Sequence, residues 1–299
     1  MPVFLFPGQG SQKAGAAKLF YEGSDAARSV LDRAIALLPD DVASVLLEGE
    51  QDALNYTRNA QPILVCLEIA IATHLMEIGV QPEICTGHSL GEIAALAFSG
   101  AMSLETTIAF VVERARLMSE NVPEGGMAAV IGVPPDDIEP FLDADTQIAN
   151  YNGTSQTIIS GATVSLGKSV AMLKEHGVRR VMPLQVSGPF HSKYMKPAAD
   201  ALKDYLAAIE INTPHFRFLS SVSGEFENDP ERIRMLLSQQ LYSPVRWTNV
   251  MEVLDNHIAV EVGPGTVLAG LAKRSTAAPK VFPADTLEAC QKFLSEIMH

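Results

Sequence analysis

Short apolar runs alternate with stretches of helical periodicity in the first third of the chain. The run Val3–Phe6 predicts a buried strand, which ends at the turn-forming residues 7–12. Mixed polar and apolar positions predict a helix over residues 14–38, and a second predicted helix over 61–78 leads into a strand over 78–84. This order of elements predicts an α/β core with a mainly parallel sheet.

The pattern changes after residue 125, where short strand-like runs surround two helical stretches. The predicted strands cover residues 127–133, 147–151, 157–160 and 179–184, and the predicted helices cover 134–142 and 164–176. This β-α-β-β-α-β order is the ferredoxin-like pattern. We therefore expect an inserted ferredoxin-like subdomain over 125–189 and a larger α/β subdomain made of 1–124 and 190–299. A ligand is expected in a cleft between the two.

A serine between two glycines stands where a predicted strand meets a predicted helix. Ser89 lies in Gly87-His88-Ser89-Leu90-Gly91, directly before a helical stretch over 92–98. A serine on such a turn is typical of a nucleophile elbow, where glycines allow close backbone approach and helix N–H groups face a developing oxyanion. The alternative is a glycine-rich turn with a buried serine. The flanking elements favour acyl transfer through Ser89.

Composition limits the classes of partner and the compartment. The chain has 299 residues, 47% of them hydrophobic, and a formal net charge of −13. This acidity argues against nucleic acid as a partner. Three widely spaced cysteines indicate neither a disulfide framework nor a metal site, which favours a cytoplasmic protein. Because no apolar run approaches the roughly 20 residues that span a bilayer, we expect neither a signal peptide nor a membrane anchor.

A serine nucleophile needs a base, and seven histidines are available. His191 follows a Gly-Pro turn at the end of the predicted insertion, where a side chain could face Ser89 across the cleft. The late pair Asp255 and His257 fits the chain order of an α/β-hydrolase triad and is the second candidate. His88 adjoins the nucleophile and is expected to point away from it. The other interpretation of His191 is a hydrogen-bonded loop histidine.

Four sequence blocks, read together, resemble the malonyl-CoA:acyl-carrier-protein transacylases and the acyltransferase domains of polyketide synthases. They are Phe6-Pro7-Gly8-Gln9-Gly10-Ser11-Gln12, Gly87-His88-Ser89-Leu90-Gly91-Glu92, Gly188-Pro189-Phe190-His191-Ser192 and Glu261-Val262-Gly263-Pro264-Gly265. The match runs through nearly the whole chain. It implies a hydrolase-like α/β core with a mainly parallel sheet and an inserted ferredoxin-like subdomain, which agrees with the pattern of the predicted elements.

The resemblance also implies the catalytic roles. Ser89 is the expected nucleophile and His191 its general base. Gln240 matches the residue that orients the histidine in the family, through an acceptor oxygen in place of a triad aspartate. The backbone N–H groups of Gln9 and Leu90 are expected to form the oxyanion hole.

Three further positions match substrate-binding residues of the family. Arg114 matches the arginine that pairs with the malonyl carboxylate, for which a planar guanidinium offers bidentate geometry, and Arg116 is its nearby competitor. Gln61 matches a glutamine that lines the pocket. Phe190 precedes the histidine and accompanies malonyl rather than methylmalonyl units in polyketide acyltransferases.

The implied enzyme is an [acyl-carrier-protein] S-malonyltransferase with ping-pong kinetics and an acyl-serine intermediate. It transfers malonyl from malonyl-CoA to the phosphopantetheine thiol of an acyl carrier protein, and so supplies extender units for fatty-acid synthesis. We expect a monomer that needs no metal and no other cofactor. The alternatives are a discrete acyltransferase or an acyl hydrolase serving a polyketide synthase, and a non-catalytic module that binds carrier protein.

Carrier proteins are acidic, and so is this chain. Docking should therefore depend on a few basic residues at the cleft, for which Lys193 and Lys196 are the candidates. The alternative is that both lysines are merely solvated.

Overall fold

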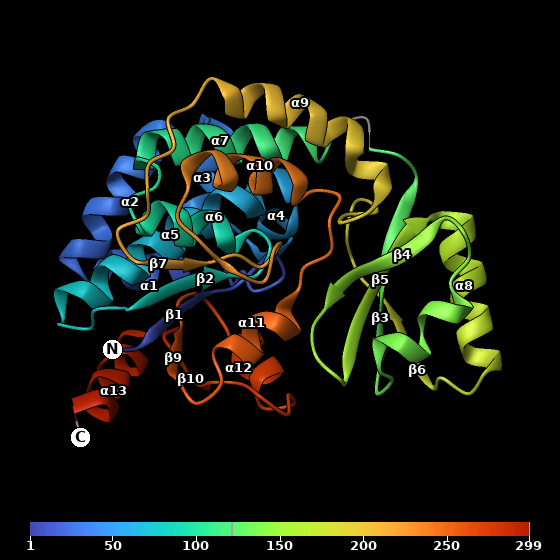
Figure 1. Ribbon diagram of the computed structural model, residues 1–299. Helices are drawn as coiled ribbons and strands as arrows, with labels where there is room; N and C mark the ends of the chain where they lie inside the picture. The colour runs from blue at the N-terminus through green and yellow to red at the C-terminus, as the bar shows by residue number, and fades with distance from the viewer. Residues whose placement is uncertain (121, 299) are drawn as a thin grey trace.

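The computed structural model describes residues 1–120 and 122–298, and the larger sheet of this part has the strand order β10-β9-β1-β2-β7-β8 (Figure 1). Its strands are β1 (Val3–Phe6), β2 (Ile84–Gly87), β7 (Arg217–Leu219), β8 (Phe226–Glu227), β9 (Ile258–Glu261) and β10 (Lys280–Pro283). Neighbouring strands are parallel except for β7 and β8. The prediction of a mainly parallel α/β core is therefore confirmed.

Side chains of β1 alternate between two layers of helices, as the period of two in a strand requires. Phe4 and Phe6 join the core cluster that contains much of α5 (Thr57–Glu77). Val3 and Leu5 face the other way and pack with a second cluster, which contains Trp247 of α11 (Trp247–Val253). Both faces of the sheet are thus covered, as is usual for parallel sheets.

The other helices around this sheet lie on both sides of it (Figure 1). They are α1 (Ala16–Gly23), α2 (Asp25–Leu37), α3 (Asp40–Glu48), α4 (Gln51–Asn55), α6 (Gly91–Phe98), α7 (Leu104–Leu117), α9 (Lys196–Ala207), α10 (Pro230–Gln239), α12 (Val267–Ala272) and α13 (Leu287–Met298). Among the described helices, α5 alone is long and apolar enough to cross a membrane, but 83% of its apolar window is buried in the protein. It packs against α2, α6 and α7, which is the position of a core helix.

A second, antiparallel sheet lies beside the first (Figure 1). Its strands β3 (Gly125–Ile131), β4 (Thr146–Tyr151), β5 (Gln156–Ala162) and β6 (Arg180–Pro183) have the order β4-β5-β3-β6, and α8 (Thr163–Glu175) joins β5 to β6. When the four strands are numbered 1 to 4 along the chain, they lie side by side in the order 2-3-1-4. This is the strand order of a ferredoxin-like sheet, as predicted. We retain 125–189 as the proposed small subdomain, with 1–124 and 190–299 as the proposed larger one.

Three predicted elements differ from the observed ones. The helix expected over 134–142 is a pair of 3₁₀ turns, Pro135–Asp137 and Glu139–Phe141, because Pro140 has no N–H for an α-helical hydrogen bond. The helix expected over 14–38 is divided at Ser24, whose extended backbone and hydroxyl cap the start of α2. The strand expected over 78–84 begins only at Ile84, since Gly79 has a φ of 95° and turns the chain after α5.

The two sheets are joined along the edge strand β4. The Tyr151 N–H donates to the main-chain oxygen of Val245 at 2.9 Å, and the Val245 N–H donates to that of Ala149 at 2.8 Å. These bonds fix one side of the small sheet against the segment that leads into α11.

Candidate active site

Ser89 stands on a strained turn between β2 and α6. Its φ of 51° is in the left-handed region, which non-glycine residues seldom occupy. The flanking glycines make this turn possible, because a Cβ on Gly87 would lie 2.0 Å from the carbonyl carbon of Gly91 and one on Gly91 would lie 2.1 Å from the oxygen of Phe6. Backbone crowding at these two positions explains why the elbow requires glycine on both sides of the serine.

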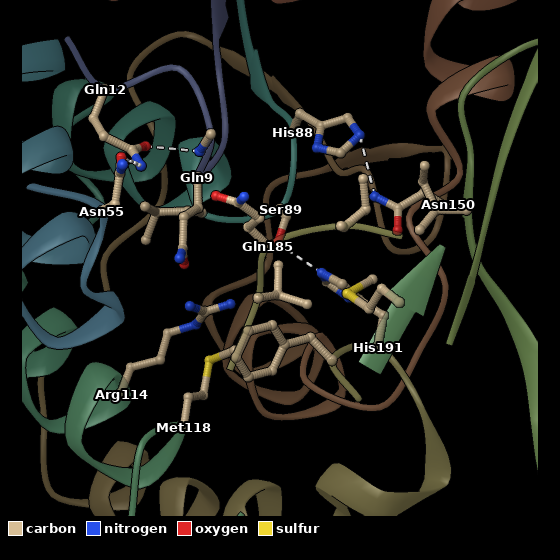
Figure 2. Close-up of a pocket in the computed structure, with 17 residues that line it drawn as sticks. Gln9, Gln12, Asn55, His88, Ser89, Arg114, Met118, Asn150, Gln185 and His191 are labelled. Atoms are coloured by element: carbon tan, nitrogen blue, oxygen red, sulfur yellow. Dashed lines mark hydrogen bonds between the residues drawn. The ribbon is translucent and has the colours of Figure 1, made fainter. Parts of the chain in front are cut away.

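The structure brings Ser89 and His191 into hydrogen-bonding contact across the boundary of the proposed subdomains. Ser89 Oγ lies 2.8 Å from His191 Nε2 (Figure 2). The other ring nitrogen, Nδ1, lies 2.9 Å from the main-chain oxygen of Gln240 and 3.1 Å from that of Ser243. Since both oxygens only accept, Nδ1 carries the proton, and Nε2 is left to accept the proton of the serine.

The environment keeps His191 neutral. Burial lowers its pKa to about 4, and the positive charge of Arg114 adds to this effect. A neutral imidazole is the form that can act as a base. The geometry therefore provides a nucleophile and a base that is ready at neutral pH.

A cavity of about 400 Å³ opens in front of this pair. Gln9, Leu90, Arg114 and Phe190 line it, as expected from the sequence, whereas Gln61 is buried behind Arg114. Much of the cavity wall is apolar and is formed by Met118, Met127, Ile158, Leu184 and Val186. A mainly apolar pocket with a few convergent polar groups is suited to a small acyl group.

Arg114 directs its guanidinium into the middle of the pocket from α7 (Figure 2). The side chain is buried, and it donates to Gln61 Oε1 at 2.5 Å and to Gln240 Oε1 at 2.9 Å. Within the described residues, its Nε has no hydrogen-bond partner. Burial lowers the pKa of Arg114 to about 10, so the group remains cationic at neutral pH and offers a site for an anion.

Arg116, the competitor, has a different setting. It is exposed and pairs with Glu113 and Glu120 on its own helix surface.

The expected oxyanion groups lie at the edge of the cavity. Leu90 directly precedes α6, and Gln9 follows β1, where its side-chain amide donates to Thr57 Oγ1 at 3.2 Å. In the part of the chain that the structure describes, the main-chain N–H groups of Gln9 and Leu90 donate no hydrogen bond to the protein. Two free N–H groups beside a nucleophile are the arrangement that an oxyanion hole requires.

The other candidate histidines do not approach Ser89. His88 turns toward Asn150 of the small sheet (Figure 2). Its Nε2 also lies 2.8 Å from Asn152 Oδ1. His257 is half-buried in the turn before β9, and its Nδ1 contacts the main-chain oxygen of Leu254. Its partner in the second candidate pair, Asp255, accepts instead from Asn256 and from the N–H of Ala278.

Gln240 contacts the histidine differently from a triad aspartate. The acceptor for His191 Nδ1 is the main-chain oxygen of Gln240, and its side chain instead faces Arg114, Glu92 and the main chain of Ser89.

Sequence reasoning missed Glu92. It is a buried carboxylate within the otherwise apolar run 91–98, and that isolation was a signal that could have identified it. It also missed Asn150 and Gln185, which line the cavity and have no local sequence signal.

Comparison with known proteins identifies similar chains. A family model described as "Acyl transferase domain" matches residues 3–288. The malonyl CoA-acyl carrier protein transacylase of Bacillus subtilis is 39% identical over 283 residues, which cover 91% of this chain and 89% of that protein. The Staphylococcus aureus (strain MRSA252) protein of the same name is 35% identical over 297 residues and covers 96% of each chain.

Solved structures are similar over almost the full length. The malonyl CoA-acyl carrier protein transacylase of Coxiella burnetii superposes with a TM-score of 0.93 at 32% identity, covering 99% of this chain and 98% of the other. A malonyl-transacylase solved in complex with a type II polyketide synthase acyl-carrier protein superposes with a TM-score of 0.92 at 32% identity, covering 98% and 99%.

Proposed function

Because the chain belongs to the acyl transferase domain family, we propose that it is an [acyl-carrier-protein] S-malonyltransferase. It transfers malonyl from malonyl-CoA to the phosphopantetheine thiol of a holo acyl carrier protein. Relatives of 35% and 39% identity carry the name of this activity. The observation in the molecule that carries the proposal is the contact of 2.8 Å between Ser89 Oγ and His191 Nε2, with the buried guanidinium of Arg114 in the same pocket.

The first half-reaction forms an acyl-serine. His191 Nε2 takes the hydroxyl proton of Ser89 while Oγ attacks the thioester carbon, and the N–H groups of Gln9 and Leu90 hold the resulting oxyanion. The C–S bond then breaks, and coenzyme A leaves as a thiol with the proton from His191. In the second half-reaction the carrier thiol attacks the acyl-serine by the same steps in reverse, which produces ping-pong kinetics.

Arg114 holds the malonyl carboxylate in this proposal. Its Nε is buried without a partner in the described part of the chain, and its two NH groups donate to neutral amide oxygens of Gln61 and Gln240. A carboxylate in the cavity would supply the countercharge that these amides lack. Phe190 is buried against the same cavity and restricts its width, which fits malonyl better than a branched acyl group.

We assign this transfer to fatty-acid synthesis. The alternative, service to a polyketide synthase, is kept because one similar structure is a malonyl-transacylase complexed with a type II polyketide synthase carrier. An acyl hydrolase or a non-catalytic carrier-binding module is not favoured, since the malonyl-binding arginine and the nucleophile are both present in one pocket.

We further propose that the protein acts as a cytoplasmic monomer. Three buried free cysteines, Cys66, Cys85 and Cys290, support a reducing compartment. The proposed chemistry needs no metal or organic cofactor, because the serine and histidine supply both nucleophile and base.

Mass spectrometry after incubation with malonyl-CoA tests the proposal. One malonyl group should be added to a peptide that contains Ser89, and holo carrier protein should remove it. The variant Ser89→Ala should take up none. Acylation at another nucleophile, or release of the label to water at the same rate without carrier protein, would contradict a transferase that acts through Ser89.

A further inference from the structure

Glu92 is a buried carboxylate in the first turn of α6, three residues after the nucleophile. Its Oε1 accepts from Ser220 Oγ at 2.6 Å. Its Oε2 accepts from Ser221 Oγ at 2.7 Å and from Gln240 Nε2 at 2.9 Å. Burial raises the pKa of this carboxyl, whereas the hydrogen bonds from Ser220, Ser221 and Gln240 stabilise its ionised form. No step of the proposed reaction uses it.

The amide of Gln240 connects Glu92 to the malonyl-binding arginine. Gln240 Oε1 accepts from Arg114 at 2.9 Å, while Nε2 donates to Glu92 and also to the main-chain oxygen of Ser89 at 3.0 Å. Rotation of the amide by 180° would place NH₂ against the guanidinium and oxygen against the carboxylate. Both contacts would then be repulsive, so the cation and the anion together fix one orientation of the amide.

The amide of Gln240 also joins two opposite charges, and neither has a direct partner of opposite sign among the described residues. Arg114 donates to neutral amides, and the donors to Glu92 are neutral hydroxyls and an amide. Both side chains are only 2% exposed. In so dry an environment, charges separated by one amide still interact appreciably. Glu92 therefore offsets part of the charge of Arg114 while the pocket is empty.

We propose that Glu92 is a positioning residue that acts through Gln240, and that its charge weakens the hold of Arg114 on the acyl carboxylate. The inference rests on the proposed function, because it assumes that Arg114 receives the malonyl carboxylate. The incoming carboxylate would contact the guanidinium directly while Glu92 lies one amide away from it, and the two like charges repel. Weaker binding of the carboxylate by Arg114 limits the affinity of the enzyme for malonyl-CoA. Tighter binding that is equal in the ground state and the transition state would lower KM without raising kcat.

Binding to an unreactive protein tests the inference without the chemistry. In a Ser89→Ala background, dissociation constants of malonyl-CoA and acetyl-CoA are measured by calorimetry with and without Glu92→Gln. Glutamine keeps the shape of Glu92 but removes its charge; its oxygen can still accept from Ser221 and Gln240, while its NH₂ faces the hydroxyl of Ser220, which can accept. The preference for malonyl-CoA over acetyl-CoA should rise about tenfold, the effect of a charge interaction worth one pKa unit. Glu92→Asp keeps the charge and is the matched control, in which the preference should stay near that of the parent.

A second readout separates the charge effect from damage to the fold. With Ser89 intact, Glu92→Gln should lower KM for malonyl-CoA without raising kcat, and circular dichroism should match the parent. Equal weakening of both thioesters, an unchanged preference, or the same shift in Glu92→Asp would overturn the inference. Failure of the Ser89→Ala parent to prefer malonyl-CoA would instead overturn the assignment of Arg114 in the proposed function, and with it the premise of this inference.

Discussion

The Nδ1 of His191 donates to the main-chain oxygen of Gln240 at 2.9 Å, and this peptide carbonyl stands where a hydrolase triad has a carboxylate. A carbonyl fixes the tautomer and the ring orientation without adding negative charge. The imidazolium that forms during acyl transfer is therefore stabilised less than it would be beside an aspartate. Burial and the charge of Arg114 lower the pKa of His191 to about 4, and the hydrogen bonds to the main-chain oxygens of Gln240 and Ser243 offset only part of this effect.

The identity of the base can be tested by comparing two histidines. His191→Ala should lower the rate of Ser89 acylation by about two orders of magnitude or more, the lower range for a positioned acid-base group. His257→Ala is the matched control, because the ring of His257 hydrogen-bonds to the main chain of its own turn, away from Ser89. Stopped-flow acylation with malonyl-CoA measures both. A larger loss in His257→Ala would restore the triad of Asp255 and His257.

The pH dependence of acylation should reflect the lowered pKa of His191. An ordinary histidine becomes protonated as the pH falls through 6.5, whereas His191 should stay neutral, and able to accept the serine proton, until the pH falls through about 4. Acylation rates at pH 5 and pH 7 should thus be similar, and the rate should fall below that range. Burst experiments from pH 3.5 to 8, with circular dichroism at each pH as a control for unfolding, measure the midpoint. A midpoint near 6.5 with the fold intact would contradict the prediction.

Arg114 should determine the preference for a carboxylated acyl group. Removing one member of a desolvated, hydrogen-bonded charge pair costs about 2 to 5 kcal/mol, so Arg114→Ala should lower kcat/KM for malonyl-CoA by roughly 30-fold to several thousand-fold. Acetyl-CoA has no carboxylate to lose, and its use should not fall in parallel. Arg116→Ala is the control, since Arg116 is exposed and, among the described residues, pairs only with Glu113 and Glu120. A parallel fall for both thioesters in Arg114→Ala would make Arg114 a structural residue.

Lys193 and Lys196 stay the candidates for carrier docking, although each has an acidic partner. Lys193 pairs with Asp145, and Lys196 pairs with Asp200. Replacing both lysines by alanine should raise KM for holo carrier protein while acylation by malonyl-CoA is unchanged, because both are exposed outside the cavity. Lys280→Ala, an exposed lysine on β10, is the control. Loss of the first half-reaction as well would indicate damage to the site instead of lost docking.

Local patterns were sufficient for the elements that carry the site. The run Val3–Phe6 is a strand because four consecutive apolar side chains can be buried on both faces of a sheet. The elbow at Ser89 could be predicted because only glycine fits at positions 87 and 91, and such a requirement leaves a mark in the sequence. The predicted helix over 134–142 was wrong: a proline can begin a helix, but Pro140 lies inside this segment and interrupts the ladder of hydrogen bonds.

The connections within the site were decided only by the tertiary structure. Residue types alone left both His191 and His257 as candidate bases, and the fold placed the first against Ser89 from 102 positions away. The histidine acceptor is a main-chain oxygen, which every residue possesses, so no sequence signal could mark it. Glu92 and Arg114 contact the two ends of the side-chain amide of Gln240, which follows them in the chain by 148 and 126 positions. Hydrophobic periodicity reports which face of an element is buried, but which buried polar groups then meet depends on how the elements pack.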